Sequence, residues 1–198
     1  MTTQATQTGA VRRLNWGCGS YPEAGWINSD RKDGPGIDLS CDIRDGLPLP
    51  DDSVDEIYSH NTLEHIDKLL LLMDEIHRVL KPGGRKLVFV PHFSNPYYYS
   101  DPTHHHFFGF YTFYYFSDEQ RHLKRPVPSF YFSRKFVVER LRLRFISPFR
   151  VINVMYRLVE WLVNLSPRTQ ELYEHSFCYL IPCYGVEATL RPVKAGAP

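Results

Sequence analysis

Two glycines and a carboxylate near the start of the chain have types and spacing that could bind a ligand. Gly17 and Gly19 flank Cys18 directly after a short apolar run, and Asp30 ends the next short run. This pattern predicts a strand, a turn tight enough to need glycine, and a second strand that brings an acid beside the turn. Backbone amides approach a ligand closely at such a turn, and the carboxylate can hold two ribose hydroxyls. The stretch therefore predicts a ligand that contains a nucleoside, although an ordinary tight turn would give the same pattern.

The spacing speaks against a dinucleotide. Residues 20–22 are Ser-Tyr-Pro, so the third glycine of a G-x-G-x-x-G motif is missing. Asp30 follows Gly17 by thirteen residues, whereas a full βαβ crossover places the acid roughly twenty residues on. The first helix must be short or replaced by a loop, which leaves little helix dipole for a pyrophosphate. S-adenosylmethionine, which carries no phosphate, suits this geometry better.

Further motifs follow in a fixed order. They are Asp42, residues 46–50 (GLPLP), 53–59 (SVDEIYS), 61–65 (NTLEH) and 76–84 (IHRVLKPGG), and the apolar run 86–91 comes next. Over residues 14–91 the chain closely resembles the class I S-adenosylmethionine-dependent methyltransferases. It departs from the family where Asn15 replaces an acid that many members carry, and in its short first helix.

The resemblance implies an α/β fold: a Rossmann-like, doubly wound, mostly parallel seven-stranded sheet with an aromatic lid insert after the fifth strand. It also implies that S-adenosylmethionine is bound and S-adenosylhomocysteine released. The cofactor-binding residues at the matching positions are Asn15, Gly17, Cys18, Gly19, Asp30, Asp42, Ile43, His60, Asn61, Leu63 and His65. Asp42 and Ile43 would border the adenine, unless Asp42 is a solvated loop acid. Glu64 and His65 together suggest a base, but in the family this histidine usually closes the pocket or packs at the strand–helix junction, and we favour that structural role.

The remaining patterns predict a single domain from residue 11 to residue 193. We expect strands at about 11–15, 26–29, 37–43, 54–59, 87–90, 137–145 and 184–193. We expect helices at 66–81, where Lys81–Gly84 ends the helix, and at 151–165, as a core, lid or dimer helix. His77 is expected on the surface of the first helix. Residues 1–10 and 194–198 are expected to be a disordered tail and a free tail.

An aromatic segment follows the fifth predicted strand, within an insert that belongs to residues 92–165. Eleven of the twenty residues in 97–116 are Phe or Tyr. Because this segment leaves the carboxyl end of a strand, we expect it to overhang the methyl group and to bind the acceptor. The candidate substrate-binding residues are Tyr97, Tyr98, Phe107 and Tyr111. Aromatic faces with hydrogen-bonding tips suit a sugar ring, and the segment resembles that of small methyltransferases in sugar and polysaccharide modification. A hydrophobic lid or a homodimer surface is an equal alternative.

Methyl transfer to a hydroxyl needs alignment, exclusion of water and a base. A histidine suits the role of base best. His104 is the first candidate and His92 the second, with Asp101 orienting the imidazole or binding the substrate. A metal ion such as Mg²⁺, held in part by Asp101 and His104, would instead lower the pKa of the hydroxyl. Three consecutive histidines cannot all face one ion from a strand.

Composition limits the other classes of function. The 198 residues carry a net charge of +1 and are 43% hydrophobic, which suffices for one core and gives no global attraction to nucleic acid. Nine Lys or Arg residues and a single acid lie in Arg121–Arg150. This stretch would suit an acidic partner, an anionic membrane or nucleic acid, and we favour a solvated edge. The four cysteines form no CxxC pair, no apolar run could span a bilayer, and no signal-like segment begins the chain, so a reduced cytoplasmic protein is expected.

These patterns together predict an enzyme that transfers a methyl group from S-adenosylmethionine to a sugar hydroxyl of an oligosaccharide or polysaccharide precursor. A methyltransferase for a nitrogen or carbon acceptor is the first alternative. A scaffold that binds the cofactor without catalysis is the second.

Overall fold

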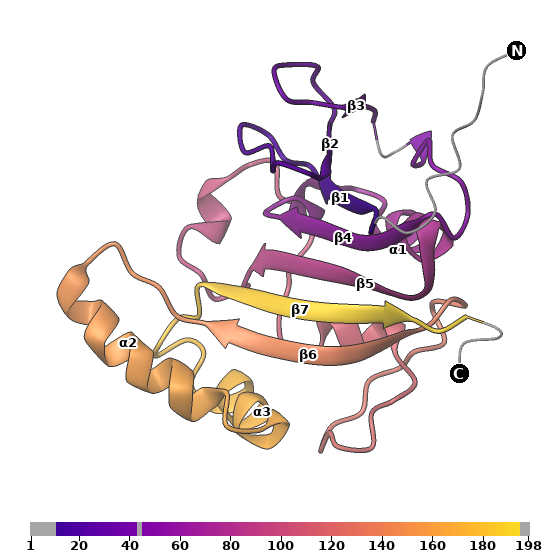
Figure 1. Ribbon diagram of the computed structural model, residues 1–198. Helices are drawn as coiled ribbons and strands as arrows, with labels where there is room; N and C mark the ends of the chain where they lie inside the picture. Colours follow the sequence, from indigo (N-terminus) through magenta and orange to yellow (C-terminus); the bar gives the residue numbers. More distant parts are fainter. Residues whose placement is uncertain (1–10, 43–44, 195–198) are drawn as a thin grey trace, which may run out of the picture.

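The computed structural model describes residues 11–42 and 45–194, and its centre is one seven-stranded sheet (Figure 1). The strands lie in the order β3-β2-β1-β4-β5-β7-β6. Their bounds are β1 Arg13–Trp16, β2 Ile27–Asp30, β3 Leu39–Ser40, β4 Val54–His60, β5 Leu80–Pro91, β6 Phe136–Arg144 and β7 Gly185–Pro192. The predicted seven-stranded α/β sheet is confirmed.

The sheet is mixed. β1 pairs in parallel with β2 and β4, β2 with β3, and β4 with β5. β7, yellow in Figure 1, runs antiparallel between β5 and β6. The carboxyl ends of the parallel strands therefore meet at one edge, where open α/β sheets place their ligand crevice.

A loop replaces the first helix, as the short distance from Gly17 to Asp30 predicts. Residues 17–26, between β1 and β2, contain only turns, a bend and irregular backbone. The predicted disordered tail, residues 1–10, and residues 195–198 lie outside the described residues. Lys194 is described, and its ammonium contacts the Asp52 carboxylate and the Arg78 carbonyl.

Helix α1 (Leu69–Val79) follows β4 through a 3₁₀ turn at Leu63–His65. Its apolar stripe is buried against the sheet, as the three-to-four spacing predicts; the residues are Leu72, Met73, Ile76 and Val79. The helix ends two residues earlier than predicted because Leu80 already pairs with Val54. Gly83 then adopts a φ of 79°, the left-handed conformation that glycine favours.

The prediction that His77 lies on the surface is wrong. The residue is 8% exposed, and its Nε2 lies 3.0 Å from the Val193 carbonyl oxygen. Its ring packs edge-on against Phe136, with the centroids 5.3 Å apart. The segments that cover this side of α1 come from more than fifty residues further along the chain, so no local pattern indicated the burial.

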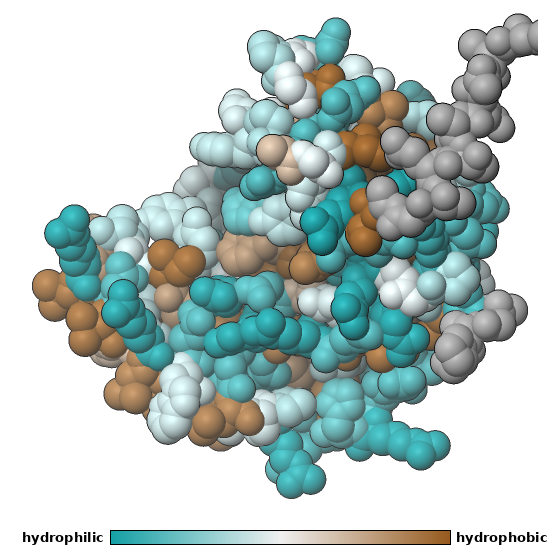
Figure 2. Space-filling model, viewed as in Figure 1, coloured by the Kyte–Doolittle hydropathy of each residue, from teal (hydrophilic) through white to brown (hydrophobic). Residues whose placement is uncertain are grey.

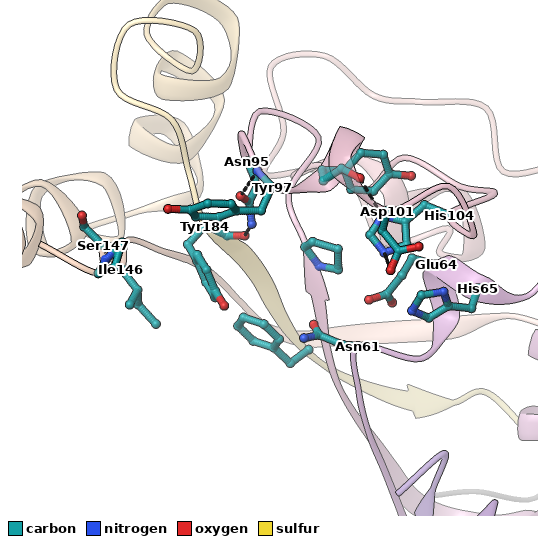
Figure 3. Close-up of a pocket in the computed structure, with 14 residues that line it drawn as sticks. Asn61, Glu64, His65, Asn95, Tyr97, Asp101, His104, Ile146, Ser147 and Tyr184 are labelled. Carbon is teal, nitrogen blue, oxygen red and sulfur yellow. Dashed lines mark hydrogen bonds and ion pairs between the residues drawn. The ribbon is translucent and has the colours of Figure 1, made fainter. Parts of the chain in front are cut away.

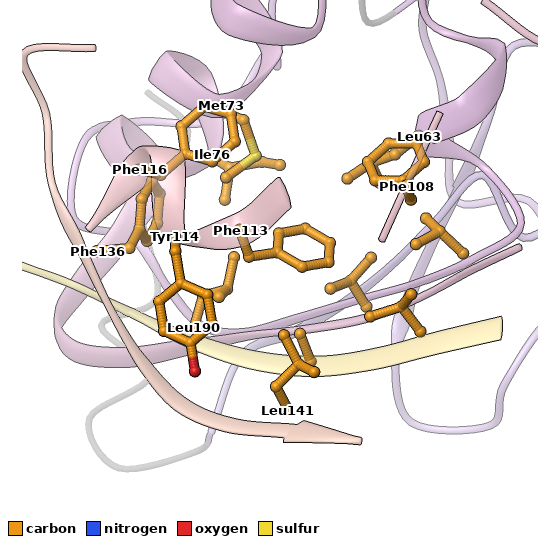
Figure 4. Close-up of a cluster of buried hydrophobic side chains, with 14 of the residues drawn as sticks. Leu63, Met73, Ile76, Phe108, Phe113, Tyr114, Phe116, Phe136, Leu141 and Leu190 are labelled. Carbon is orange, nitrogen blue, oxygen red and sulfur yellow. The ribbon is translucent and has the colours of Figure 1, made fainter. Parts of the chain in front are cut away.

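The second half of the aromatic segment is core (Figure 4). Phe108, Phe110, Phe113, Tyr114 and Phe116 are each at most 4% exposed. They pack in one cluster with residues of α1 and of the sheet, among them Met73, Ile76 and Leu190. Burial of such rings contributes roughly 25 cal/mol per Å² of apolar surface. This part of the insert therefore stabilises the fold, and only the part before it is free to line a site.

Two helices lie between β6 and β7, namely α2 (Arg150–Val163) and α3 (Pro167–Ser176). Ser166 caps α3: its hydroxyl accepts from the Thr169 amide, and Thr169 bonds back to the Ser166 amide. Helix α2 turns its polar side inward, where Asn153 bonds Ser147 and the Glu160 carboxylate accepts from the Phe145 amide. None of the helices in the described ranges is long and apolar enough to cross a bilayer.

The outer side of α2 is apolar. Val151, Val154, Leu158 and Trp161 are between 57% and 86% exposed, and brown side chains gather over this helix in Figure 2. Residues 151–165 are predicted to form a core, lid or dimer helix. Because these four side chains are exposed, the core role is wrong for them. The homodimer surface stays a prediction.

Lys86 is a buried amine in the middle of the sheet. It is 0% exposed, and its Nζ lies 2.5 Å from Ser59 Oγ and 5.5 Å from the centre of the Trp16 ring. Burial lowers the pKa of the Lys86 ammonium well below its ordinary value. Between that lowered pKa and the unfolded value near 10.5, the unfolded chain binds one more proton than the folded chain. Stability from this group therefore rises with pH across that window.

We expect Lys86→Met to remove this pH dependence. The free energy of unfolding of wild type minus that of the variant should increase as the pH rises from 7 toward 10. Urea denaturation at several pH values measures it. Lys68→Met, at an exposed position, is the control and should leave the slope unchanged. A parallel pH dependence in Lys86→Met and wild type would contradict the burial of a lowered-pKa amine.

Candidate active site

The glycine turn lies at the carboxyl end of β1 and is held by the next strand. The amides of Gly17 and Cys18 both donate to the Ser29 carbonyl, at 2.9 and 3.1 Å. Gly17 has a φ of 65°, and a Cβ built on it would lie 2.3 Å from Thr62 Cγ2. The glycine is thus required for the close approach of the segment after β4. From the sequence, we expect glycine here so that the backbone amide can approach a ligand. The structure gives a different reason, which is the close contact with Thr62.

Asp30 lies beside this turn, as predicted. Its Oδ2 accepts from the Gly19 amide at 2.9 Å, and its Oδ1 accepts from the Lys32 amide at 3.1 Å. These bonds fix the carboxylate at the end of β2, and each oxygen keeps a further lone pair for a ligand hydroxyl. The geometry suits the predicted contact with a ribose.

A cavity of about 600 Å³ opens in front of the turn. It is lined by Trp16, Gly17, Asp30, Arg31, Cys41, Asp42, Asn61, Thr62, His65, Ile66, Asp67, Thr103 and His105. Its size is that of a small-molecule site. It combines the three carboxylates Asp30, Asp42 and Asp67 with apolar walls from Trp16 and Ile66. Hydrogen-bond acceptors beside apolar walls fit the hydroxyls, the amino group and the ring of an adenosine. We call it the cofactor cavity.

Five of the predicted cofactor residues line this cavity, namely Gly17, Asp30, Asp42, Asn61 and His65. Ile43 lies outside the described residues. The other five, Asn15, Cys18, Gly19, His60 and Leu63, are not among the lining residues. Sequence reasoning missed Thr103 and His105, because they come from the insert and reach the cavity only through the fold.

The five residues that do not line the cavity make contacts within the protein, and their predicted contact with the cofactor stays a prediction. Asn15 is 4% exposed and donates to the Tyr21 carbonyl and to Asn28 Oδ1, which supports the loop after the turn. Leu63 is core, 1% exposed. His60 stacks on Phe89 with the ring centres 4.6 Å apart. The amide of Gly19 holds Asp30, and Cys18 is buried.

A second cavity of about 560 Å³ adjoins the first (Figure 3). Its lining residues are Asn61, Glu64, His65, Phe89, Pro91, Asn95, Tyr97, Tyr98, Asp101, His104, Ile146, Ser147, Pro148 and Tyr184. Asn61 and His65 belong to both cavities. Asn61 directly follows β4 and has a φ of 50°, a left-handed conformation that asparagine tolerates. We call this second space the acceptor cavity.

Acidic and imidazole groups gather at one end of the acceptor cavity. Figure 3 shows Glu64, His65, Asp101 and His104 close together there, with Tyr97 and Tyr184 on the other side. One atom each from Glu64, His65 and His104 lies within 4.8 Å of the others. We call these three residues the Glu64 cluster. Burial, with a smaller contribution from Asp101, raises the pKa of Glu64 to about 7. Burial and the nearby His104 lower the pKa of His65.

Three of the predicted catalytic and substrate residues do not face this cavity. His92 is 0% exposed; its Nδ1 accepts from the Ser94 amide and its Nε2 lies 3.1 Å from Glu174 Oε2. With both ring nitrogens engaged, it is a structural residue and not the base. Phe107 is 61% exposed and packs on Tyr98 outside the cavity. Tyr111 donates its hydroxyl to Glu171.

His104, Asp101, Tyr97 and Tyr98 do line the acceptor cavity. Asp101 accepts from the amide and the hydroxyl of Thr103, at 2.8 and 2.6 Å. Glu64 also lines this cavity, although from the sequence we weigh it with His65 as a base and favour a structural role. Only the 3₁₀ turn shows that it points into the cavity.

Comparisons with known proteins agree with this fold. Residues 15–88 match the family model described as a methyltransferase domain. The YcgJ protein of Bacillus subtilis is similar in structure, with 16% identity, 94% of this chain and 93% of that chain covered, and a TM-score of 0.57. An S-adenosylmethionine-dependent methyltransferase of Mesorhizobium loti gives 17% identity, 92% and 91% coverage and a TM-score of 0.48. An S-adenosylmethionine-dependent methyltransferase of Archaeoglobus fulgidus has 18% identity, with 92% of this chain and 86% of that chain covered and a TM-score of 0.48. The search of curated proteins found no match.

The sheet order and the ligand edge define a class I methyltransferase fold, and the family match falls on the strands and loops that build the cofactor cavity. Residues 15–88 carry the match to a methyltransferase domain, which supports a methyltransferase, and S-adenosylmethionine stays the predicted cofactor. The cofactor supplies an activated methyl group on sulfur.

Proposed function

We propose that this methyltransferase transfers the methyl group to a hydroxyl of a sugar. The observation that carries the proposal is the contact between the two cavities at Asn61 and His65. One cavity has the groups for an adenosine. The other has ring faces from Phe89, Tyr97 and Tyr184 opposite the polar Glu64 cluster.

The walls of the acceptor cavity support a sugar. The rings of Phe89 and Tyr184 lie with their centres 6.1 Å apart, and Asn95 fixes the rim by donating to the Tyr184 carbonyl and accepting from the Tyr97 amide. Sugars present C–H faces that pack on such rings and hydroxyls that need acceptors. The Glu64 cluster and Asp101 provide those acceptors at one end. An oligosaccharide or polysaccharide precursor fits an open cavity of this kind, and a mannoside is one member of the class.

In the proposed reaction the acceptor oxygen loses its proton as it forms the new bond to the methyl carbon. The bond from carbon to sulfur breaks, and its electron pair stays on sulfur, which gives S-adenosylhomocysteine. His104 is the proposed proton acceptor, because its Nδ1 lies 2.9 Å from the Tyr98 carbonyl, which can only accept. Nδ1 therefore carries the proton, and Nε2 keeps a lone pair. A general base contributes roughly a hundredfold or more.

Mg²⁺, the predicted alternative to a base, fits the site less well. Mg²⁺ prefers oxygen ligands in octahedral geometry, and two of the three members of the Glu64 cluster are imidazoles. We therefore derive no step through Mg²⁺.

The proposed function predicts release of S-adenosylhomocysteine on sugars. The experiment incubates the enzyme and S-adenosylmethionine with a panel of oligosaccharides that includes mannosides, each paired with its fully O-methylated form as control. Product should form with the free sugars and not with the methylated ones. Release on amines alone would replace this proposal with a nitrogen acceptor. Silence on all acceptors, with S-adenosylmethionine still bound by calorimetry, would favour the non-catalytic scaffold.

A further inference from the structure

The Glu64 cluster joins two separate parts of the chain. Glu64 and His65 belong to the 3₁₀ turn after β4, and His104 comes from the insert after β5. The His65 and His104 rings are 4.8 Å apart between centres. The turn and the insert are tied together by the His105 amide, which donates to the Glu64 carbonyl at 2.7 Å. The three side chains are therefore held in place on both sides.

Both imidazoles are oriented by an acceptor at Nδ1. His104 donates from Nδ1 to the Tyr98 carbonyl. His65 Nδ1 lies 2.8 Å from Thr103 Oγ1, and that hydroxyl already donates to Asp101 Oδ1. Since the Thr103 proton is committed to Asp101, His65 must be the donor to Thr103. Each ring is thus left with a lone pair on Nε2.

One oxygen of the Glu64 carboxylate is buried without a partner. The residue is 1% exposed, and its Oε2 has no hydrogen-bond partner within the described part of the chain. A buried acceptor without a donor costs about 1–3 kcal/mol. One ligand atom from each of the three side chains lies within 4.8 Å of the other two, so the cluster offers three electron-pair donors to a cation.

We propose that the Glu64 cluster binds a divalent transition-metal ion. Two imidazoles and one carboxylate form the ligand set of catalytic Zn²⁺ sites, which keep a position open for water or substrate. A metal-binding histidine usually donates the N–H of its other ring nitrogen to a carboxylate, a backbone carbonyl or water. Here His104 donates to a backbone carbonyl, and His65 donates to a hydroxyl that is bonded to a carboxylate. The open position faces the acceptor cavity.

The role of the ion rests on the proposed function. The ion would lower the pKa of an acceptor hydroxyl bound to it. The proton of the hydroxyl leaves to solvent at the open rim, where Asp101 is 43% exposed in its side chain. The acceptor oxygen then attacks the methyl carbon, and the bond to sulfur breaks as described above. In this arrangement His104 binds the ion and does not itself take the proton.

Metal binding is tested without any acceptor. The purified full chain is freed of metal with a chelator, dialysed against Zn²⁺ or Co²⁺ and measured for metal content, with the visible spectrum of Co²⁺ as the report of nitrogen ligands. We expect one ion for each chain. Glu64→Gln and His104→Ala should weaken the affinity roughly tenfold or more, and Thr103→Val, which removes the partner of His65, by roughly 10–100-fold.

His175→Ala, an exposed histidine on α3, is the matched control and should bind the ion like wild type. Circular dichroism confirms that each variant is folded. A chain that binds neither Zn²⁺ nor Co²⁺ but still binds S-adenosylmethionine would overturn the metal site and leave direct proton transfer to His104. Binding of one metal ion for each chain, with no methylation of any sugar, would instead overturn the proposed acceptor and leave the metal site standing.

Discussion

His104→Ala should lower turnover on the acceptor roughly a hundredfold or more, while the affinity for S-adenosylmethionine stays at its wild-type value. The reason is the position of the side chain, which lines the acceptor cavity and is not among the residues that line the cofactor cavity. The loss is expected whether His104 takes the proton itself or binds a cation that lowers the pKa of the hydroxyl. Initial rates of S-adenosylhomocysteine release and calorimetric titration of the cofactor measure the two quantities separately.

The control for His104→Ala is again His175→Ala, which changes the same residue type far from both cavities. Turnover of the His104 variant within a factor of about two of wild type would rule out both roles. It would agree instead with an amine acceptor, which is a good nucleophile without a base. His92 could not replace His104 as the base, since both of its ring nitrogens are engaged in the core.

Gly17→Ala should destabilise the fold and abolish tight binding of the cofactor. Alanine at a φ of 65° costs about 1–2 kcal/mol in backbone strain alone. Its Cβ would also lie 2.3 Å from Thr62 Cγ2 and 2.7 Å from Thr62 Oγ1. The segment after β4 must move away, and this segment carries Asn61 and Thr62 of the cofactor cavity. Thermal unfolding and calorimetric titration measure the two effects.

Gly19→Ala separates backbone strain from the steric contact. Gly19 has a φ of 53°, and nothing lies within 4 Å of a Cβ built there. We expect this variant to lose only the strain energy, which corresponds to about 2–4 °C in melting temperature per kcal/mol for a chain of this length. Thr62→Ala in the Gly17→Ala background should restore part of the cofactor affinity. Equal losses in the two single glycine variants would show that the contact with Thr62 is unimportant.

The sheet and the cofactor edge could be predicted because their signals are local. Apolar runs and alternation predict the strands, and the distance from Gly17 to Asp30 leaves no room for a helix. Asp30 lies beside the turn because parallel neighbours end at the same edge. These inferences need only a few consecutive residues.

The roles of single histidines and aromatic rings could not be predicted in this way. His92 is buried by Glu174, which is eighty-two positions later in the chain. Phe108 and Tyr97 belong to one aromatic segment, yet the first is core and the second lines the acceptor cavity. The spacing of α2 predicts an apolar stripe but not that the stripe faces outward, because direction depends on Ser147 and Phe145, which bond its polar side.

The place of β7 in the sheet has a consequence for synthesis on the ribosome. Within the described residues, β6 is joined to the rest of the sheet only through β7, which follows it in the chain. While the chain is being made, β6 therefore has no partner, and one side of β5 stays open until residues 185–192 emerge. Such distant pairing slows folding and exposes strand edges meanwhile. The sheet can close only after β7 has been made, so nascent chains that stop before β7 should depend on chaperones.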